Sequence, residues 1–204
     1  MRSALCLLCL AAALAGCRAA APLGLDDWRA LDAPGRHAAA VRLLAESDVT
    51  ALSGDRYALA APTLATPVVV GGFVPGRVPG VRSELVVVGA ALGGPAAPVL
   101  LDAAFALARE ARYGLAPERT VLVALWPRGA GPRDVLALPV WPASRRRAML
   151  WVGADGPRTD GSPNAALAPV RVDLNAALSR EAASAELQAR ILQAAAAADT
   201  LATP

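Results

Sequence analysis

The feature that most constrains the fold is a set of short, nearly unbroken apolar runs. In the stretch SELVVVGAALGG, residues 83–94, Glu84 precedes a run of leucine and valine that ends in glycine and alanine. The run RTVLVALW at 119–126 has the same character. Strands that are apolar on both faces are typical of a parallel sheet with helices on both sides. The sequence therefore predicts an α/β fold, a three-layer α/β/α arrangement around a mostly parallel sheet.

Periodicity and turn residues predict the other elements. The clearest helix is 99–113, in which an apolar stripe repeats at helical spacing, Asp102 faces away from the core, and Gly114 ends the helix. The expected strands are 67–74, 84–90, 119–126, 147–153 and, more exposed, 169–174. The other expected helices are 36–47 and 176–198. The residues expected to be buried are Val41, Leu44, Ala45, Val86, Val88, Leu122, Val123, Leu187, Ile191 and Leu192.

The first 17 residues, MRSALCLLCLAAALAGC, have the pattern of a secretory signal. An arginine near the start is followed by an apolar run and then by small residues. The segment Leu14-Ala15-Gly16-Cys17 resembles the lipobox of bacterial lipoproteins, in which the cysteine becomes the lipid-bearing first residue. An ordinary cleaved signal is the alternative. We expect a signal peptide at 1–16, a tether at 17–25 and a single domain at 26–204.

The predicted signal and lipid anchor account for all three cysteines of the chain. Cys6 and Cys9 have C-x-x-C spacing but lie inside the apolar signal, so we expect no metal or redox role for them. With Cys17 acylated, the mature chain has no free thiol and no disulfide. Several acyl chains on one residue hold a protein firmly to a membrane. The expected location is the bacterial cell envelope, lipid-anchored to a membrane on its periplasmic or outer face.

Charge and aromatic content argue against nucleic acid as a partner. All 20 basic residues are arginines, the net charge is only +3, and the arginines are scattered along the chain. Nucleic-acid binding favours a concentrated basic patch and aromatic side chains for stacking, but aromatic residues make up 4% of the chain. The run at 145–147 (RRR) precedes an expected strand and favours a solvated edge, with contact to anionic lipid headgroups as the alternative.

Three segments together resemble a known family. The runs VVVGGFVPGRVPGVRSELVVVGA, APERTVLVAL and RRRAMLWVG, in that order and spacing, resemble the core of the zinc aminopeptidases related to aminopeptidase Y. The resemblance covers 68–153 and, loosely, the C-terminal helix. It implies a zinc-aminopeptidase framework. Members of that family hold two zinc ions with two histidines and acidic residues, and a glutamate serves as the general base for peptide hydrolysis.

The positions at which the resemblance places the family's ligands are vacated in this chain. Ala91 and Gly93 follow the expected strand 84–90. Arg128 and Gly129 follow the strand 119–126, and Gly153 stands at the end of the strand 147–153. The only histidine, His37, lies on the expected N-terminal helix, so a two-histidine site cannot form within one chain. We therefore expect no zinc, no other cofactor and no catalytic residue.

Other chemistries find no support in the sequence. The chain lacks G-x-S-x-G and lysine, which excludes a nucleophile elbow, a Walker loop and a Schiff base. Asp155 and Asp160 lie close together and suggest a calcium site, but Arg158 between them favours a solvated turn. A lone histidine such as His37 is more often an exposed or edge residue than a catalytic one.

These observations favour a membrane-anchored lipoprotein with a zinc-aminopeptidase-like, non-catalytic domain that binds or scaffolds in the envelope. Arg128, standing where a carboxylate is expected, suggests a peptide C-terminus or an acidic small molecule as ligand. An active metallopeptidase or other hydrolase, with an atypical site or one completed by a partner, is the alternative. A decaying gene product without a selected function is the third.

Overall fold

The computed structural model describes residues 25–60, 68–140, 142–153, 170–172 and 179–197. The predicted signal peptide, all three cysteines and the loop that holds Asp155, Arg158 and Asp160 lie outside the described residues.

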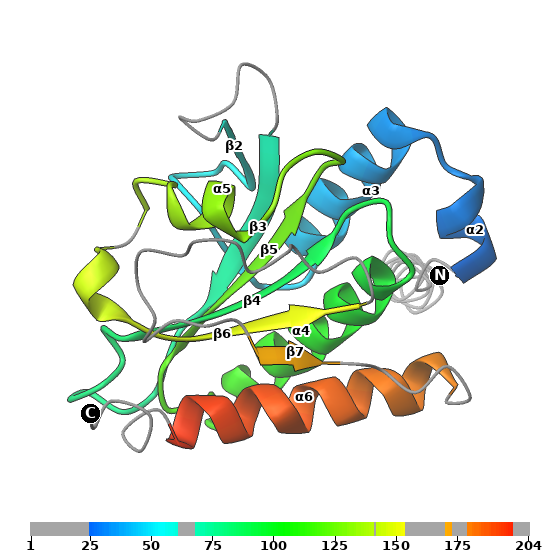
Figure 1. Cartoon of the computed structure of the whole chain (residues 1–204). Coiled ribbons are helices and arrows are strands. Elements are labelled where there is room, and N and C mark those ends of the chain that lie inside the picture. The colour runs from blue at the N-terminus through cyan, green and yellow to red at the C-terminus, as the bar shows by residue number, and fades with distance from the viewer. Residues whose placement is uncertain (1–24, 61–67, 141, 154–169, 173–178, 198–204) are drawn as a thin grey trace, which may run out of the picture.

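Seven strands form one mixed sheet in the order β1-β3-β5-β4-β6-β7, with β2 also paired to β3 (Figure 1). The strands are β1 Thr50–Ala51, β2 Ala58–Ala60, β3 Val68–Val74, β4 Leu85–Ala91, β5 Thr120–Trp126, β6 Arg146–Val152 and β7 Val170–Val172. The four longest expected strands are confirmed to within a residue at each end, and β7 lies within the fifth, of which only 170–172 is among the described residues.

The expectation of a mostly parallel sheet is correct for only part of it. Strand β4 is parallel to β5 and β6, and β6 is parallel to β7, but β3 is antiparallel to β5, β1 and β2. The connection from β3 to β4 is the ten-residue segment 75–84 and contains no helix. A parallel crossover needs a dozen or more residues, usually with a helix, so this connection reverses the chain direction.

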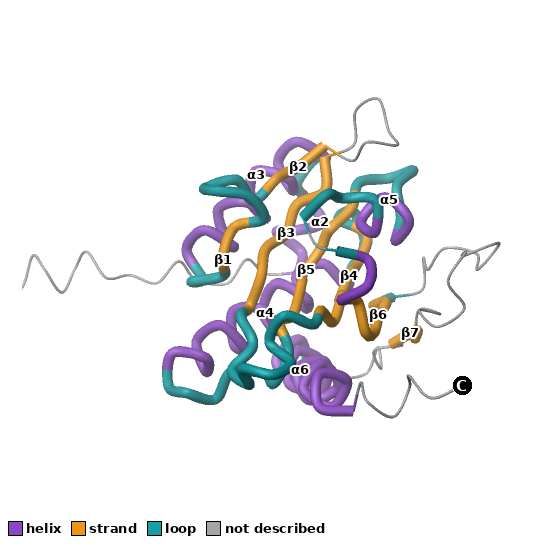
Figure 2. Tube along the Cα trace, turned by 90° about the vertical axis from the view of Figure 1, so that its left-hand side faces the viewer, coloured by secondary structure: helices purple, strands orange, loops and turns teal. Residues whose placement is uncertain are grey.

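Helices α2, α3, α4 and α6 pack together on one face of the sheet. The helices are α2 Leu25–Ala30, α3 Ala33–Glu46, α4 Ala96–Arg112, α5 Pro132–Leu136 and α6 Arg180–Ala197, with a 3-10 turn η1 at Ala143–Arg145. Figure 2 shows α3 and α5 on opposite sides of the strands. Helix α5 has only five residues, and it is the one α-helix that the described residues place on this second face of the sheet. The described residues therefore do not establish the expected second helical layer.

Two helices begin earlier than their periodicity predicts, and each begins beside a proline. Helix α3 begins at Ala33 because the Asp32 carboxylate caps it by accepting a hydrogen bond from the Gly35 amide at 2.7 Å. Helix α4 begins at Ala96 rather than 99, since a proline such as Pro98 is tolerated in a first turn. Helix α2 was not expected, and it begins at Leu25, the last residue of the predicted tether.

Most of the expected core is confirmed, but Val41 and Leu192 are only half-buried against it and Ala45 is exposed. The central-strand residues, Val86, Val88, Leu122 and Val123, are fully or almost fully buried, as are Leu187 and Ile191 on α6. On α3 the buried residues are Ala39, Ala40 and Leu44, while Ala45 is exposed. The prediction for Ala45 was wrong because the helix faces the sheet through a stripe rotated by one position.

Candidate functional site

The parallel strands bring the vacated family positions to one edge of the sheet. Ala91 is the last residue of β4 and pairs in register with Trp126, the last residue of β5. Gly153 directly follows β6, which pairs with β4 on its other side. In open α/β sheets, ligands bind outside the carboxyl ends of the strands. This edge is therefore the candidate functional site.

A shallow hollow lies at the ends of β4 and β6, in front of the first turn of α4. It is small: the centre of a water molecule can occupy about 10 Å³ of it, and the wider volume of about 230 Å³ includes open solvent. The lining residues are Ala91, Gly94, Pro95, Ala96, Trp151, Val152 and Gly153. Gly153 has a φ of +107°, and a Cβ there would lie 3.2 Å from Ala96, so this corner of the hollow requires glycine. The lining residues that the structure describes are small or apolar and carry no charge.

The first turn of α4 gives this edge a positive electrostatic character. Its N-cap residue, Pro95, makes no side-chain cap hydrogen bond, and the first turn contains no acidic residue. The positive end of the helix dipole is therefore uncompensated by the helix itself. The Ala97 amide is bonded to the Gly94 carbonyl at 3.3 Å, which leaves a weak rather than a fully formed anion site.

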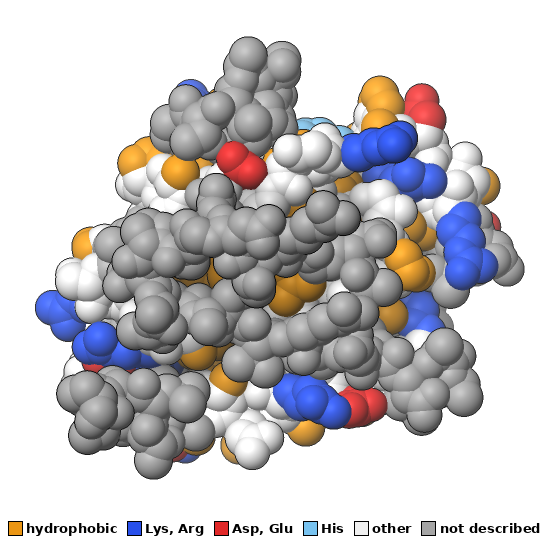
Figure 3. All heavy atoms as spheres, in the orientation of Figure 1, with side chains coloured by type: hydrophobic (Ala, Val, Ile, Leu, Met, Phe, Trp, Pro, Cys, Tyr) orange, Lys and Arg blue, Asp and Glu red, His pale blue; other side chains and the backbone are white. Residues whose placement is uncertain are grey.

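Arg36 on α3 adds a cation that sequence reasoning missed. Its Nε and Nη2 donate to the carbonyls of Trp28 and Arg29 at 3.1 and 3.0 Å, which fix the guanidinium at the end of α2. A Cβ built on Gly93 would have Arg36 Nη1 as its nearest neighbour, at 3.6 Å. The guanidinium thus lies against the β4–α4 loop. Figure 3 shows basic side chains gathered over α2 and the start of α3.

The other expected site residues lie elsewhere. Arg128 and Gly129 follow β5 and are exposed, and Arg128 does not line the hollow. His37 is half-buried on α3. Asp102 does face away from the core stripe, and its carboxylate accepts two hydrogen bonds from Arg180 at 2.5 and 2.7 Å. This ion pair fastens α6 to α4. Among the described residues, no group of three or more His, Cys, Asp and Glu side chains is placed to hold a metal ion.

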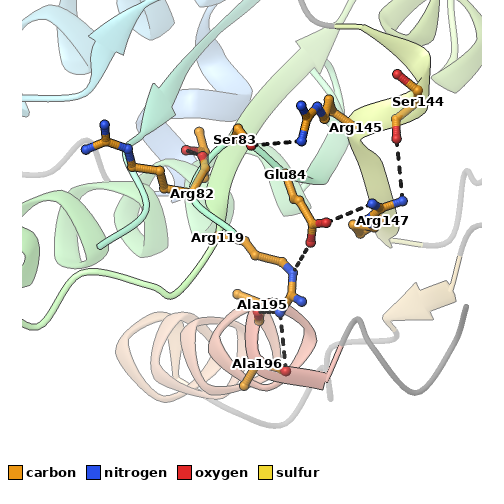
Figure 4. Close-up of polar contacts among 10 residues, drawn as sticks. Arg82, Ser83, Glu84, Arg119, Ser144, Arg145, Arg147, Ala195 and Ala196 are labelled. Carbon is orange, nitrogen blue, oxygen red and sulfur yellow. Dashed lines mark hydrogen bonds and ion pairs between the residues drawn. The ribbon is translucent and has the colours of Figure 1, made fainter. Parts of the chain in front are cut away.

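The charged side chains that the sheet does bury lie at its opposite, amino edge (Figure 4). The Glu84 carboxylate is mostly buried and accepts hydrogen bonds from Arg119 Nε at 2.8 Å and Arg147 Nη2 at 2.7 Å. Hydrogen bonds from Arg147 and Arg119, with their charges, hold the pKa of Glu84 below its ordinary value of 4.5, although burial opposes this. We call Glu84, Arg119 and Arg147 the amino-edge cluster.

Arg119 also joins this cluster to the C-terminal helix. Its side chain is 1% exposed, and Nη1 donates to the carbonyl of Ala195 at 2.6 Å and, more weakly, of Ala196 at 3.3 Å. These carbonyls belong to the last turn of α6, where helix carbonyls lack partners and the dipole favours a cation. The cluster corrects the expectation of a solvated arginine run at 145–147: Arg145 is exposed, but Arg147 is paired and Arg146 is half-buried, which lowers the Arg146 pKa.

Two tryptophans close the carboxyl edge on the face opposite α4. The rings of Trp126 and Trp151 stack across β4 with centroids 3.9 Å apart. Gly89 lies between them on β4, and a Cβ there would come within 2.1 Å of the Trp126 ring. The glycine that ends the valine run is thus required by packing. No chemistry is needed to explain it.

Comparison of the chain with protein-family models and with curated protein sequences found no match. Within the described residues, no helix is long and apolar enough to cross a membrane.

Proposed function

We propose that the chain is a lipid-anchored protein of the bacterial cell envelope whose aminopeptidase-like domain binds a ligand and does not catalyse a reaction. The observation that carries the proposal is the hollow at the carboxyl ends of β4 and β6. It occupies the place where α/β proteins bind ligands, and the described part of its lining offers no side chain that can act as a nucleophile, base or metal ligand.

The ligand class we propose is a carboxylate, as in a peptide C-terminus or an acidic small molecule. The start of α4 and the Arg36 guanidinium are two positive features that meet at the β4–α4 loop. Arginine binds carboxylates through charge-assisted hydrogen bonds, and a helix N-terminus favours an anion. Arg128, exposed after β5, is a further cation at the same edge and in our proposal contacts the outer part of the ligand.

Titration of the mature domain with matched peptides tests this ligand class. A short peptide with a free C-terminal carboxylate should bind, and the same peptide with a C-terminal amide should bind roughly tenfold more weakly, because about 1.4 kcal/mol of charge-assisted binding is lost. Arg36→Gln should weaken carboxylate binding to the same extent. Arg42→Gln, an exposed position on the same helix, is the control and should leave it unchanged. Equal binding of the two peptides would contradict a carboxylate ligand.

The anchor is tested separately by Cys17→Ser. The wild-type chain should fractionate with membranes and carry an acylated N-terminal cysteine by mass spectrometry. The variant should appear in the soluble envelope fraction or stay unprocessed. An unmodified mature N-terminus at another residue would contradict the lipid anchor without affecting the ligand test.

A further inference from the structure

The large apolar side chains exposed to solvent lie close together. Among the residues whose exposure is described, they are Phe105, Tyr113 and Leu115, exposed to 43%, 78% and 64%. All lie in the second half of α4 or just beyond it. The chain contains only two phenylalanines and two tyrosines, so half of them are displayed in this one segment.

These side chains share one helix face with two arginines. Phe105, Arg109, Arg112 and Tyr113 follow the spacing i, i+4, i+7 and i+8, which places them along one stripe, and all four are exposed. The Arg109 guanidinium lies 6.0 Å from the centroid of the Phe105 ring. Arg112 also forms an ion pair with Asp48 at the end of α3. We call these four residues with Leu115 the α4 stripe.

The composition of the stripe matches a membrane–water interface. Phenylalanine and leucine insert among acyl chains, whereas tyrosine places an apolar ring below and a hydroxyl at headgroup level. Arginine side chains extend along apolar surface while their charge stays among anionic headgroups. Of the two arginines of the stripe, Arg112 is paired with Asp48, so the positive charge that an anionic bilayer attracts is that of Arg109.

The proposed anchor can hold this stripe at the bilayer. Helix α2 begins at Leu25 and packs on the same face of the sheet as α4. Seven residues lie between Cys17 and Leu25, and the eight Cα-to-Cα steps that join them reach at most about 28 Å. Measured along α4 from Ala96, Phe105 lies about 14 Å and Tyr113 about 26 Å away. The start of α4 lies beside the α2–α3 junction, so the reach of the tether is comparable with the distance from the start of α4 to the far end of the stripe.

We propose that the α4 stripe docks onto the anionic surface of the membrane that carries the anchor. This inference rests on the proposed lipid at Cys17. Anchoring makes the contact intramolecular, so a patch with little affinity of its own is held in place by the high effective concentration. Docking lays the helical face of the domain on the membrane and leaves the opposite sheet face, with α5, toward solvent.

Spin labels on the lipidated mature chain test the docking. In our proposal the signal with Cys6 and Cys9 is removed and Cys17 is acylated, so Tyr113→Cys provides a single reactive thiol. On vesicles of phosphatidylcholine and phosphatidylglycerol, the label at position 113 should be shielded several-fold from a water-soluble relaxation agent. A label at Ser144→Cys, exposed on η1 and outside the stripe, is the matched control and should stay accessible. Adding Phe105→Ser should reduce the shielding.

The outcomes separate the docking from the anchor on which it depends. Failure of the wild-type chain to float with vesicles would contradict the anchor. Flotation with equal accessibility at positions 113 and 144 would overturn the docking and leave the anchor intact. Shielding at position 113 without vesicles would overturn it in favour of a second copy of the chain. Equal shielding on pure phosphatidylcholine would overturn the role given to Arg109.

Discussion

The two ends of the parallel strands differ sharply in how they use charge. At the amino edge, Glu84 and Arg119 are buried, paired with each other and linked to the last turn of α6. At the carboxyl edge, where α/β enzymes place their reactive groups, the hollow is lined by alanine, glycine, proline, valine and tryptophan. The buried Glu84–Arg119 pair therefore fixes helix α6 to the sheet, whereas the described lining of the hollow at the carboxyl edge carries no charged side chain.

The difference indicates which substitutions the fold tolerates. A charged side chain inside the sheet is stable only where partners are built around it, as they are around Glu84. At the carboxyl edge, the described lining of the hollow is uncharged, and the exposed loop at Gly93 leaves room for a carboxylate beside Arg36.

Val88→Asp should unfold the domain. Val88 is fully buried in the middle of β4, between β5 and β6, and no partner for a carboxylate is built there. A domain is typically stable by only 5–15 kcal/mol. The free-energy cost of burying an unpaired charge exceeds that stability. Circular dichroism should show loss of the cooperative thermal transition. A variant that melts like the wild type would contradict the assignment of β4 to the centre of the sheet.

Glu84→Gln should destabilise the domain by about 3–5 kcal/mol, because it leaves the buried Arg119 guanidinium without its counter-charge. Urea unfolding followed by tryptophan fluorescence measures the loss. Arg190→Gln is the control, since it removes the exposed Arg190–Glu186 pair on α6. That change should cost no more than about 0.5 kcal/mol. Similar losses in the two variants would contradict a structural role specific to the amino-edge cluster.

Acidification should weaken the wild type through the same carboxylate. Hydrogen bonding to Arg147 and Arg119 lowers the folded-state pKa of Glu84 below its ordinary value of 4.5. A lowered pKa contributes stability that is fully present above 4.5 and is lost as the pH falls through the folded-state value. The free energy of unfolding should therefore decline below pH 4.5, and the decline should be shallower in Glu84→Gln. Parallel pH profiles for the two proteins would contradict this coupling.

Gly93→Asp should have the smallest effect, within about 0.5 kcal/mol of the wild type. Gly93 is exposed, and the one atom within 4 Å of a Cβ built there is Arg36 Nη1, at 3.6 Å, which is a favourable neighbour for a carboxylate. The variant should also weaken binding of a peptide carboxylate, because the new side chain occupies the Arg36 guanidinium. A large loss of stability would show that the carboxyl edge is as tightly specified as the amino edge.

The sequence predicted the strands well because each is a short apolar run bounded by turn residues, as in 119–126. It did not predict strand direction, since β3 looks as buried as a parallel strand yet pairs antiparallel with β5. The strands β1 and β2 were missed because two or three residues give no period to detect.

The sequence predicted only those parts of the candidate site that follow from the order and direction of the strands. The strand ends that carry Ala91 and Gly153 follow from the expected parallel arrangement, and the structure brings both to one hollow. Arg36 was missed because its approach to Gly93 depends on how α3 packs, and no local pattern marks it. The buried ion pair of Glu84 with Arg119 was likewise not predicted, since a charge at a strand end is usually solvated. A charge at the start of each of two neighbouring strands was the one available signal.

The most direct test of the central claim is metal content measured together with turnover on the purified mature chain. The positions that resemble the family's ligand sites hold Ala91, Gly93, Arg128, Gly129 and Gly153. Catalytic zinc is usually held by three protein ligands that include histidine, and this chain has one histidine, on α3. We predict no stoichiometric zinc after incubation with the metal and no hydrolysis of aminoacyl chromogenic substrates. Near-equimolar zinc with turnover that a chelator abolishes would contradict the non-catalytic account and favour an active hydrolase.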